Sequence, residues 1–381
     1  MDKEVKYIGF YELMDEQYKR NSCISATNKM NYIIKAINKT GRKVKVISPA
    51  WFIEKADRYA KEKEFTIDEN NSLVLAPSFS TNNKITMKLK SWFSQLWLLK
   101  YLLINVKRGE KIIAYHSLAL MWPIYFAKII KGFELIYEVE EIYTDVINKC
   151  KFQKKVELKI ISIADKYIFS TELLNNKVNI NNKENIILYG IYETQEITKE
   201  SFNDNKIHIV YAGTFDIRKG GVKLAIESSK YLDEKYHIHI LGFGTEKDKK
   251  YVKSLIRNIS SKTRCKITYE GLYKGNKFND FIQKCNIGLS TQNSNAEFND
   301  TSFPSKILTY LCNGLNVVSV KIKVLEKSKI NDLLFYYENN DPREIANCIE
   351  NVNCHSKYGI FNKINNLNDD FILNLKNVLE N

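Results

Sequence analysis

A glycine-rich loop carrying two cations is the first part of this 381-residue chain whose residue types suggest chemistry. It reads GTFDIRKGG from Gly213 to Gly221 and directly follows an apolar run, IHIVY. Gly213 permits a tight turn, and Arg218 and Lys219 place two cations just before a helical pattern. Arginine offers a planar fork to phosphate oxygens and lysine a compact charge, so the loop suits a diphosphate leaving group. The alternative is a surface turn with two solvated cations.

A polar loop before another helical pattern could bind the same kind of ligand. It reads NDTSFPSK over residues 299–306 and runs into ILTYLCNG. Free N–H groups at a helix N-terminus bind phosphate or sugar hydroxyls, and Lys306 lies one turn into this pattern. The alternative is ordinary capping by Thr301 or Ser302, with Pro304 in the first turn.

Two further candidates lie in the first half of the chain. His116 directly follows the apolar run KIIAY, where a histidine could donate to a sugar hydroxyl or a phosphate; the alternative is a structural histidine. Glu138, Glu140 and Glu141 follow one another at the end of the next apolar run. They could bind the hydroxyls of an acceptor, or they could form a solvated acidic turn.

The elements that would position these residues alternate along the chain. Strands are predicted at Lys6–Tyr11, Val44–Ser48, Ser72–Ala76, Lys111–Tyr115, Glu134–Val139, Lys166–Ser170, Asn185–Tyr189, Ile207–Tyr211, Tyr236–Leu241, Cys265–Tyr269, Asn286–Ser290 and Asn316–Val320. Helices are predicted at Thr27–Asn38, Lys88–Ile104, Met121–Ile130, Lys154–Ala164, Val222–Leu232, Lys247–Ile259, Asn276–Lys284, Pro304–Asn313 and Leu367–Leu379. This alternation predicts an α/β protein with mostly parallel sheets.

The polar stretch 190–204 separates two similar series of elements. We therefore predict two Rossmann-like, doubly wound domains that face a central cleft, residues 1–190 and 205–364. A C-terminal helix, 365–381, is expected to pack back on the first domain. Ligands of such sheets bind beyond the carboxyl ends of the strands, which is where the candidate loops lie.

Composition excludes several classes of protein and leaves others open. The chain has 58 Lys and Arg against 44 Asp and Glu, a net charge of +14. Residues 1–190 hold 31 of these basic and 21 of these acidic residues, or +10, which suits an anionic membrane surface or a phosphorylated ligand. No run of 18 apolar residues and no signal-peptide pattern is found, so we expect a cytoplasmic protein.

Several standard motifs for cofactors and metals are missing from the sequence. The seven cysteines are scattered without CxxC, which favours a reducing compartment, and the five histidines contain no HExxH. We expect no cofactor and no metal. Neither a dinucleotide fingerprint nor a GxxxxGK[ST] P-loop occurs.

Taken in order, the segments VYAGTFDIRKGG, ILGFG, ITYEGLY, CNIGLS and TSFPSKILTYLCNGLNVVS resemble the nucleotide-binding half of GT-B glycosyltransferases. More narrowly, they resemble family 4, the "group 1" retaining enzymes of bacterial polysaccharide biosynthesis. SATNKMNYIIKAINKTGRKVKVIS and ADKYIFSTELL in the first half are also similar, so the resemblance covers about the whole chain in order.

The resemblance implies roles for individual residues. Arg218 and Lys219 would face the donor diphosphate, and His116 would contact the donor sugar and support the leaving group. The other donor-binding positions would be Gly213, Thr214, Gly242, Gly244, Tyr269, Leu272, Thr301, Ser302, Phe303, Lys306 and Thr309. Glu138, Glu140 and Glu141 would bind the acceptor.

The sequence departs from that family at the pair of glutamates that most members carry eight positions apart. Thr301 and Thr309 stand at these positions. A hydroxyl can bind ribose, but it lacks the charge-assisted bond of a carboxylate, worth roughly 1–2 kcal/mol more. This departure motivates an alternative, a non-catalytic GT-B-like subunit that binds or chaperones a partner glycosyltransferase.

The resemblance thus implies a retaining glycosyltransferase of the hexosyl or N-acetylhexosaminyl type. It would move a sugar from a nucleotide-diphosphate donor, with a UDP-sugar favoured, to a glycan or lipid-linked saccharide in surface polysaccharide or capsule synthesis. Trp92, Phe93, Trp97 and Lys100 on one predicted helix could place it at the inner face of the cytoplasmic membrane, unless they belong to a core helix. No motif supports nucleic-acid binding, despite the basic charge.

Overall fold

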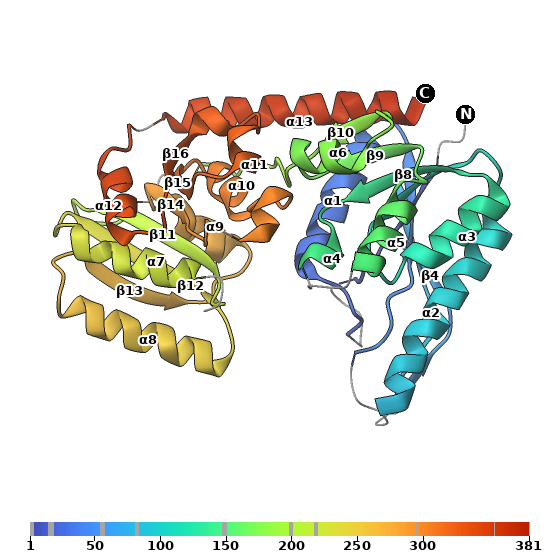
Figure 1. Ribbon diagram of the computed structural model, residues 1–381, viewed down its shortest axis with the longest axis horizontal. Helices are drawn as coiled ribbons and strands as arrows, with labels where there is room; N and C mark the ends of the chain where they lie inside the picture. The colour runs from blue at the N-terminus through green and yellow to red at the C-terminus, as the bar shows by residue number, and fades with distance from the viewer. Residues whose placement is uncertain are drawn as a thin grey trace. The chain divides into compact units, whose positions relative to one another are not determined.

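The computed structural model describes residues 4–13, 19–53, 58–80, 84–146, 151–197, 201–216, 220–294, 296–353 and 355–380 (Figure 1). The chain divides into two compact units. Unit 1 comprises Met1–Leu188 and Asp370–Asn381, and unit 2 comprises Tyr189–Asp369. Each unit is an α/β structure built on its own sheet.

Unit 1 is organised around an eight-stranded sheet with the order β10-β9-β8-β7-β1-β2-β5-β4. All neighbours are parallel except β4 and β5. The strands are β1 (Glu4–Ile8), β2 (Lys43–Ser48), β4 (Lys63–Thr66), β5 (Asn71–Leu75), β7 (Lys111–Tyr115), β8 (Glu134–Val139), β9 (Lys166–Phe169) and β10 (Asn185–Ile187). A separate antiparallel pair joins β3 (Arg58–Ala60) to β6 (Ser78–Ser80).

The helices of unit 1 are α1 (Ile24–Lys39), α2 (Lys84–Asn105), α3 (Met121–Lys131), α4 (Tyr143–Val146), α5 (Lys151–Ile161) and α6 (Glu172–Val178). The buried face of α2 packs into a core with the central strands through Leu98 and Leu102. Gly132 ends α3 with a φ of 65°, a left-handed conformation that glycine adopts at little cost.

Unit 2 has a six-stranded, fully parallel sheet with the order β13-β12-β11-β14-β15-β16. The strands are β11 (Ile207–Thr214), β12 (Tyr236–Phe243), β13 (Lys266–Gly271), β14 (Ile287–Ser290), β15 (Asn316–Val320) and β16 (Leu334–Tyr337). The helices are α7 (Gly221–Ser228), α8 (Glu246–Ser260), α9 (Asn276–Gln283), α10 (Lys306–Leu311), α11 (Lys323–Glu326) and α12 (Pro342–Glu350). Short 3₁₀ turns occur at Ser229–Tyr231, Glu297–Asp300 and Asn331–Leu333.

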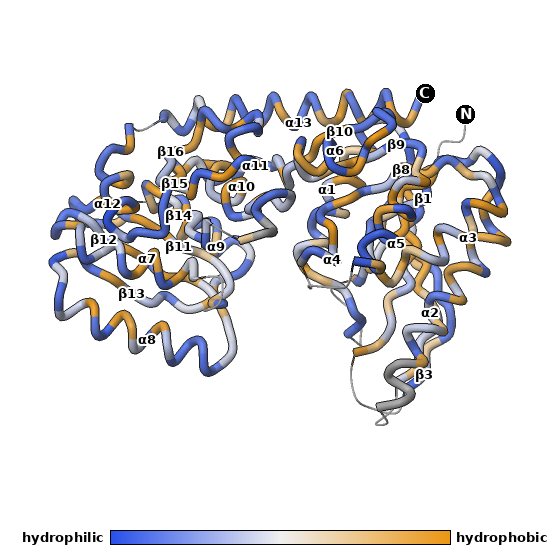
Figure 2. The backbone as a smooth tube through the Cα atoms, in the orientation of Figure 1, coloured by the Kyte–Doolittle hydropathy of each residue, from blue (hydrophilic) through white to orange (hydrophobic). Residues whose placement is uncertain are grey.

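The last helix, α13 (Lys357–Glu380), contributes residues to both units. Its apolar residues recur every three or four positions, as one helix face requires, and seven of them are buried: Ile360, Ile364, Leu367, Phe371, Leu375, Val378 and Leu379. Figure 2 shows this alternation of apolar and polar residues along the helix. Among the described residues, no helix is both long and apolar enough to cross a bilayer.

The observed elements extend the sequence-based prediction at several places. The predicted strands are all found, with ends shifted by up to three residues. The short β3, β4, β6 and β16 and the helices α4, α6, α11 and α12 were not predicted. α13 begins ten residues before the predicted Leu367, because burial of Ile360 and Ile364 outweighs the low helix propensity of Gly359 and the asparagines around it.

Candidate functional site

The carboxyl edge of the unit 2 sheet gathers most of the predicted donor-binding residues. Since β11, β12, β13 and β14 are parallel, their carboxyl ends share one edge. Gly213 and Thr214 end β11, Gly242 lies near the end of β12, and Leu272 directly follows β13. Ligands of open parallel sheets bind at this edge.

Two glycines let adjacent strands approach closely there. Gly242 has a φ of +148°, and a Cβ at this position would lie 1.8 Å from the carbonyl oxygen of Gly213. A Cβ at Gly213 would in turn lie 2.4 Å from Cε of Lys306. Gly242 therefore requires glycine, whereas Gly213 leaves the space that the end of the Lys306 side chain fills. Farther along, Gly244 packs close to Phe215 and Asp248.

Lys306 reaches from the start of α10 to the end of β11. Its Nζ donates a hydrogen bond of 2.9 Å to the hydroxyl of Tyr211 and lies 4.0 Å from the centre of that ring. Burial raises the pKa of Tyr211, so its hydroxyl stays neutral and can accept this bond. The structure thus holds an ammonium group beside Gly213, at the edge where open parallel sheets bind their ligands.

The loop before α10 is more buried than a simple surface turn. Thr301 is buried, Ser302 and Phe303 are half-buried, and the Phe303 ring stacks on Tyr189 with centres 5.0 Å apart. α10 begins at Lys306 rather than at the predicted Pro304. Thr309 Oγ1 donates to the carbonyl of Ser305 at 3.3 Å, within its own helix.

The predicted donor-binding residues Tyr269 and Leu272 lie at the end of β13 and directly after it. Tyr269 is half-buried, with its ring centre 5.9 Å from that of Phe215 and Nζ of Lys253 5.1 Å away. Leu272 follows Gly271, whose φ is +82°, and is half exposed. An aromatic ring and an exposed aliphatic side chain therefore flank this edge.

His116 is fully buried at the end of β7 in unit 1. Its ring packs between Tyr137 and Tyr143, with centres 5.5 and 5.3 Å away, and its Nε2 lies 3.3 Å from Oε1 of Glu157. Burial lowers the pKa of His116 to about 3, so the imidazole is neutral at ordinary pH. A direct contact with a donor sugar stays a prediction, because this side chain has no exposed surface here.

Glu138, Glu140 and Glu141 separate into different environments. Glu138 is fully buried and accepts a hydrogen bond from the hydroxyl of Tyr7, and burial raises its pKa. Glu140 is half-buried and forms an ion pair with Lys29, which also donates to the carbonyl of Leu188 at 3.1 Å. Glu141 is half-buried as well. The acceptor role proposed for the three carboxylates stays a prediction.

Sequence reasoning missed Glu157, Tyr7 and Tyr211. Glu157 is fully buried on α5, and its carboxylate accepts the backbone N–H groups of Tyr143 and Thr144 at 2.8 and 3.0 Å. It therefore caps α4 while it faces His116. The alternation of side chains along each strand could have placed Tyr7 and Tyr211 in the cores. No local motif indicates a role for Glu157.

The two residues assigned to the donor diphosphate, Arg218 and Lys219, lie outside the described residues. The described chain stops at Asp216 and resumes at Gly220, whose φ is +69°. Gly221 starts α7, and a Cβ there would lie 2.3 Å from the carbonyl oxygen of Thr291. The two glycines at the end of the loop therefore meet a backbone requirement.

No protein-family model and no curated protein matches the chain. Solved structures do match it over 99% of its length. They include an α,α-trehalose 6-phosphate synthase from Burkholderia multivorans, with 9% identity, 95% of that chain covered and a TM-score of 0.66. A second is described as trehalose-6-phosphate from E. coli bound with UDP-2-fluoro glucose, with 10% identity, 97% covered and a TM-score of 0.64. A third is a glycosyltransferase from Rickettsia africae, with 12% identity, 97% covered and a TM-score of 0.60.

At these identities the likeness concerns the fold. The matched structures are GT-B proteins with two Rossmann-like domains, and the match extends through both units of this chain. The chain therefore has the GT-B fold, as the sequence predicted.

Proposed function

We propose that this protein is a glycosyltransferase that uses a nucleotide-diphosphate sugar. The observation that carries the proposal is the carboxyl edge of the unit 2 sheet, where Gly213 and Gly242 allow close packing of strand ends and Lys306 supplies an ammonium group. The GT-B fold supports it, because one structure of that fold is described as bound to UDP-2-fluoro glucose. A UDP-sugar is accordingly the donor we favour.

The residues of this edge would act mainly on the leaving group. Negative charge builds on the diphosphate as the bond to the sugar breaks, and fixed cations stabilise it. Lys306 would supply one of these charges, and Arg218 and Lys219 would supply two more from the loop before α7. We propose that the reaction retains anomeric configuration and that His116, which faces Glu157, positions the groups around the sugar.

The first test is calorimetric titration of the full-length protein with UDP, GDP, CMP and a control oligonucleotide, without added metal. We expect selective binding of UDP that falls about 10-fold or more in Lys219→Ala, because a charge-assisted bond contributes about 1.5–3 kcal/mol. Transfer from radiolabelled UDP-sugars then identifies the donor. A folded protein that binds no nucleotide would contradict the proposal and would favour the partner-binding subunit instead.

We further propose that unit 1 presents the acceptor and contacts an anionic membrane surface, where lipid-linked saccharides are extended. The observation that favours this is a row of aromatic side chains across α2 and α3. The ring centres of Trp92 and Trp122 are 6.1 Å apart, and those of Trp122 and Phe126 are 6.3 Å apart. Large apolar side chains of the two helices stay exposed: Leu89, Trp92, Phe93, Leu96, Ile104, Phe126, Ile129 and Ile130. Apolar faces of this kind with nearby cations are typical of interfacial helices.

On this proposal the acceptor is a lipid-linked glycan of surface polysaccharide or capsule synthesis, and the transferred sugar is a hexose or an N-acetylhexosamine. The family 4 assignment belongs to the same proposal, because it rests on the motif order in the sequence. Glu138, Glu140 and Glu141 are the acceptor-side residues of this model.

A further inference from the structure

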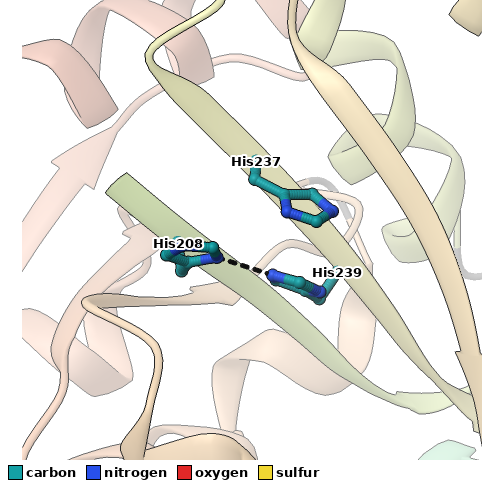
Figure 3. Close-up of side chains that lie close together, drawn as sticks. All are labelled: His208, His237 and His239. Atoms are coloured by element: carbon teal, nitrogen blue, oxygen red, sulfur yellow. Dashed lines mark hydrogen bonds between the residues drawn. The ribbon is translucent and has the colours of Figure 1, made fainter. Parts of the chain in front are cut away.

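Three of the five histidines meet inside unit 2, at the opposite end of its sheet from the glycine edge. His208 is the second residue of β11, and His237 and His239 are the second and fourth residues of β12. His208 lies opposite His237 and Val210 opposite His239, so the three side chains share one face of the sheet. All three are buried, and one nitrogen from each lies within 4.8 Å of the others (Figure 3).

Two of the imidazoles face each other and are held from outside by carboxylates. His208 Nδ1 lies 2.9 Å from His239 Nε2. The outer nitrogen of His208, Nε2, lies 2.7 Å from Oδ1 of Asp204, and the outer nitrogen of His239, Nδ1, lies 2.8 Å from Oε1 of Glu270. Carboxylate–histidine pairs of this kind commonly support histidine ligands of metals.

These four side chains hold one proton fewer than their three contacts need. Three short contacts join Asp204, His208, His239 and Glu270, and each needs one proton to be a hydrogen bond. Ionised carboxylates only accept, and two neutral imidazoles bring two protons. When both imidazoles donate outward, two lone pairs face each other at 2.9 Å, and a cation is needed between them.

His237 adds a third lone pair. Thr268 donates its hydroxyl proton to Glu270, so its oxygen can only accept from His237 Nε2, 2.9 Å away. His237 Nε2 therefore carries the proton and Nδ1 is bare. Nδ1 is buried and has no hydrogen-bond partner among the described residues. Figure 3 shows the His237 ring beside the point where the other two rings meet.

We propose that His208 Nδ1, His237 Nδ1 and His239 Nε2 bind a divalent transition-metal ion, with Zn²⁺ as the ion of choice. Imidazole nitrogens bind Zn²⁺ at about 2.0–2.1 Å, so two tetrahedral ligands stand about 3.3–3.4 Å apart. The His208–His239 contact of 2.9 Å needs to open by roughly half an ångström to meet this geometry. A water molecule would complete the four ligands.

The surroundings suit a structural ion. Phe202 stacks on His208 and His239 with ring centres 4.0 and 5.0 Å away, and Phe281 of α9 packs edge-on against His239. The Asp204 side chain keeps 39% of its surface exposed, which gives an ion an entry path. The site would fasten β11, β12 and the segment at 202–204 together, and it is independent of glycosyl transfer.

The test uses full-length protein made without a polyhistidine tag and stripped with a chelator. Zn²⁺ is then titrated in competition with a chromophoric chelator, and Co²⁺ absorption reports the coordination geometry. We expect one tetrahedral ion per chain in the wild type and in His355→Gln, which changes a histidine outside the cluster. His239→Gln should lose this site. Zn²⁺ should therefore raise the Tm of the wild type and of His355→Gln and leave the Tm of His239→Gln unchanged.

A milder pair of variants covers the case in which His239→Gln does not fold. Glu270→Gln and Asp204→Asn keep all three ligands, and we expect each to weaken Zn²⁺ binding about 10–100-fold. X-ray absorption of the zinc-loaded wild type should show imidazole scattering. Absence of stoichiometric binding by the wild type, a sulfur-bound ion, or wild-type affinity in both carboxylate variants would overturn the proposal and leave a shared proton as the occupant.

Discussion

At the scale of single residues, Lys306 has the most specific surroundings in the candidate donor site. Its ammonium group lies over Tyr211 and fills the space that Gly213 leaves open. A lysine without a nucleotide role could sit on any exposed face of α10. Its placement at the strand edge is therefore the feature that mutagenesis should address first.

The first prediction concerns this lysine. Lys306→Met keeps the length of the side chain and removes its charge. We expect UDP affinity to fall about 10–100-fold, since a hydrogen bond to a charged group contributes about 1.5–3 kcal/mol. Calorimetry measures the change, and Lys363→Met is the matched control, because Lys363 forms an ion pair with Asp332, which precedes β16 at the opposite edge of the sheet. Equal affinity in the two variants would remove Lys306 from the site.

The second prediction concerns the protonation of His116. Because its pKa is about 3, His116 stays neutral in the folded protein between pH 6.5 and 3, whereas the unfolded chain binds a proton there below about pH 6.5. This group therefore costs no stability above pH 6.5 and destabilises the fold progressively as the pH falls from 6.5 toward 3. Long-range ¹H–¹⁵N spectra should show a neutral His116 from pH 7 to 5, with the signal assigned by its loss in His116→Asn. A midpoint near 6.5 would contradict the burial described here.

At the scale of elements, the C-terminal part of α13 is attached to unit 1 by packing and by polar contacts. Phe371 is buried and stacks on Tyr32 of α1 with ring centres 5.6 Å apart. Lys166 Nζ and Lys111 Nζ donate to the carbonyls of Val378 and Leu379 at 2.9 and 3.0 Å. Cations at a helix C-terminus satisfy its last carbonyls and the helix dipole.

The third prediction tests this attachment. Phe371→Ala should lower the free energy of unfolding of unit 1 by about 3–5 kcal/mol, because the cavity adds to the lost transfer energy. The four tryptophans, Trp51, Trp92, Trp97 and Trp122, all belong to unit 1, so their fluorescence during urea unfolding reports on it. Leu373→Ala is the control on the same helix, since Leu373 is 59% exposed, and it should change stability by less than about 0.5 kcal/mol. Similar losses in both variants would contradict the packing.

At the scale of the whole molecule, a positive net charge occurs together with exposed apolar side chains. The chain carries a net charge of +14, and α2 and α3 expose large apolar side chains. Each feature alone has an ordinary explanation in a lysine-rich soluble surface. Positive charge and exposed apolar side chains together are typical of proteins that bind at a membrane interface.

The fourth prediction is that the protein co-sediments with vesicles containing phosphatidylglycerol and much less with phosphatidylcholine alone. The double variant Trp92→Ser, Leu96→Ser should reduce the bound fraction several-fold, since it removes part of the apolar contact. Leu373→Ser is the control, because it removes an equally exposed leucine from another helix. Binding should weaken with salt as surface charges are screened. No binding at physiological salt would count against a membrane role.

Local sequence determined the fold class and most of the elements of this protein. Runs such as KIIAY and ELIYEV coincide with β7 and β8, because buried parallel strands leave a continuous apolar signal. The order of strands, helices and glycine-rich turns likewise placed Gly213 and Gly242 near strand ends and the residues before Lys306 at the start of a helix. These features follow from periodicity and turn chemistry, which act over a few neighbouring residues.

Only the tertiary structure decided which distant residues meet. Glu157 contacts His116, which lies 41 positions earlier in the sequence, and Lys306 contacts Tyr211, which lies 95 positions earlier. No local sequence pattern predicts either contact. His208 and His239 face each other because adjacent parallel strands align them in register. Such contacts depend on strand order and register, which are set by packing of the whole sheet rather than by neighbours along the chain.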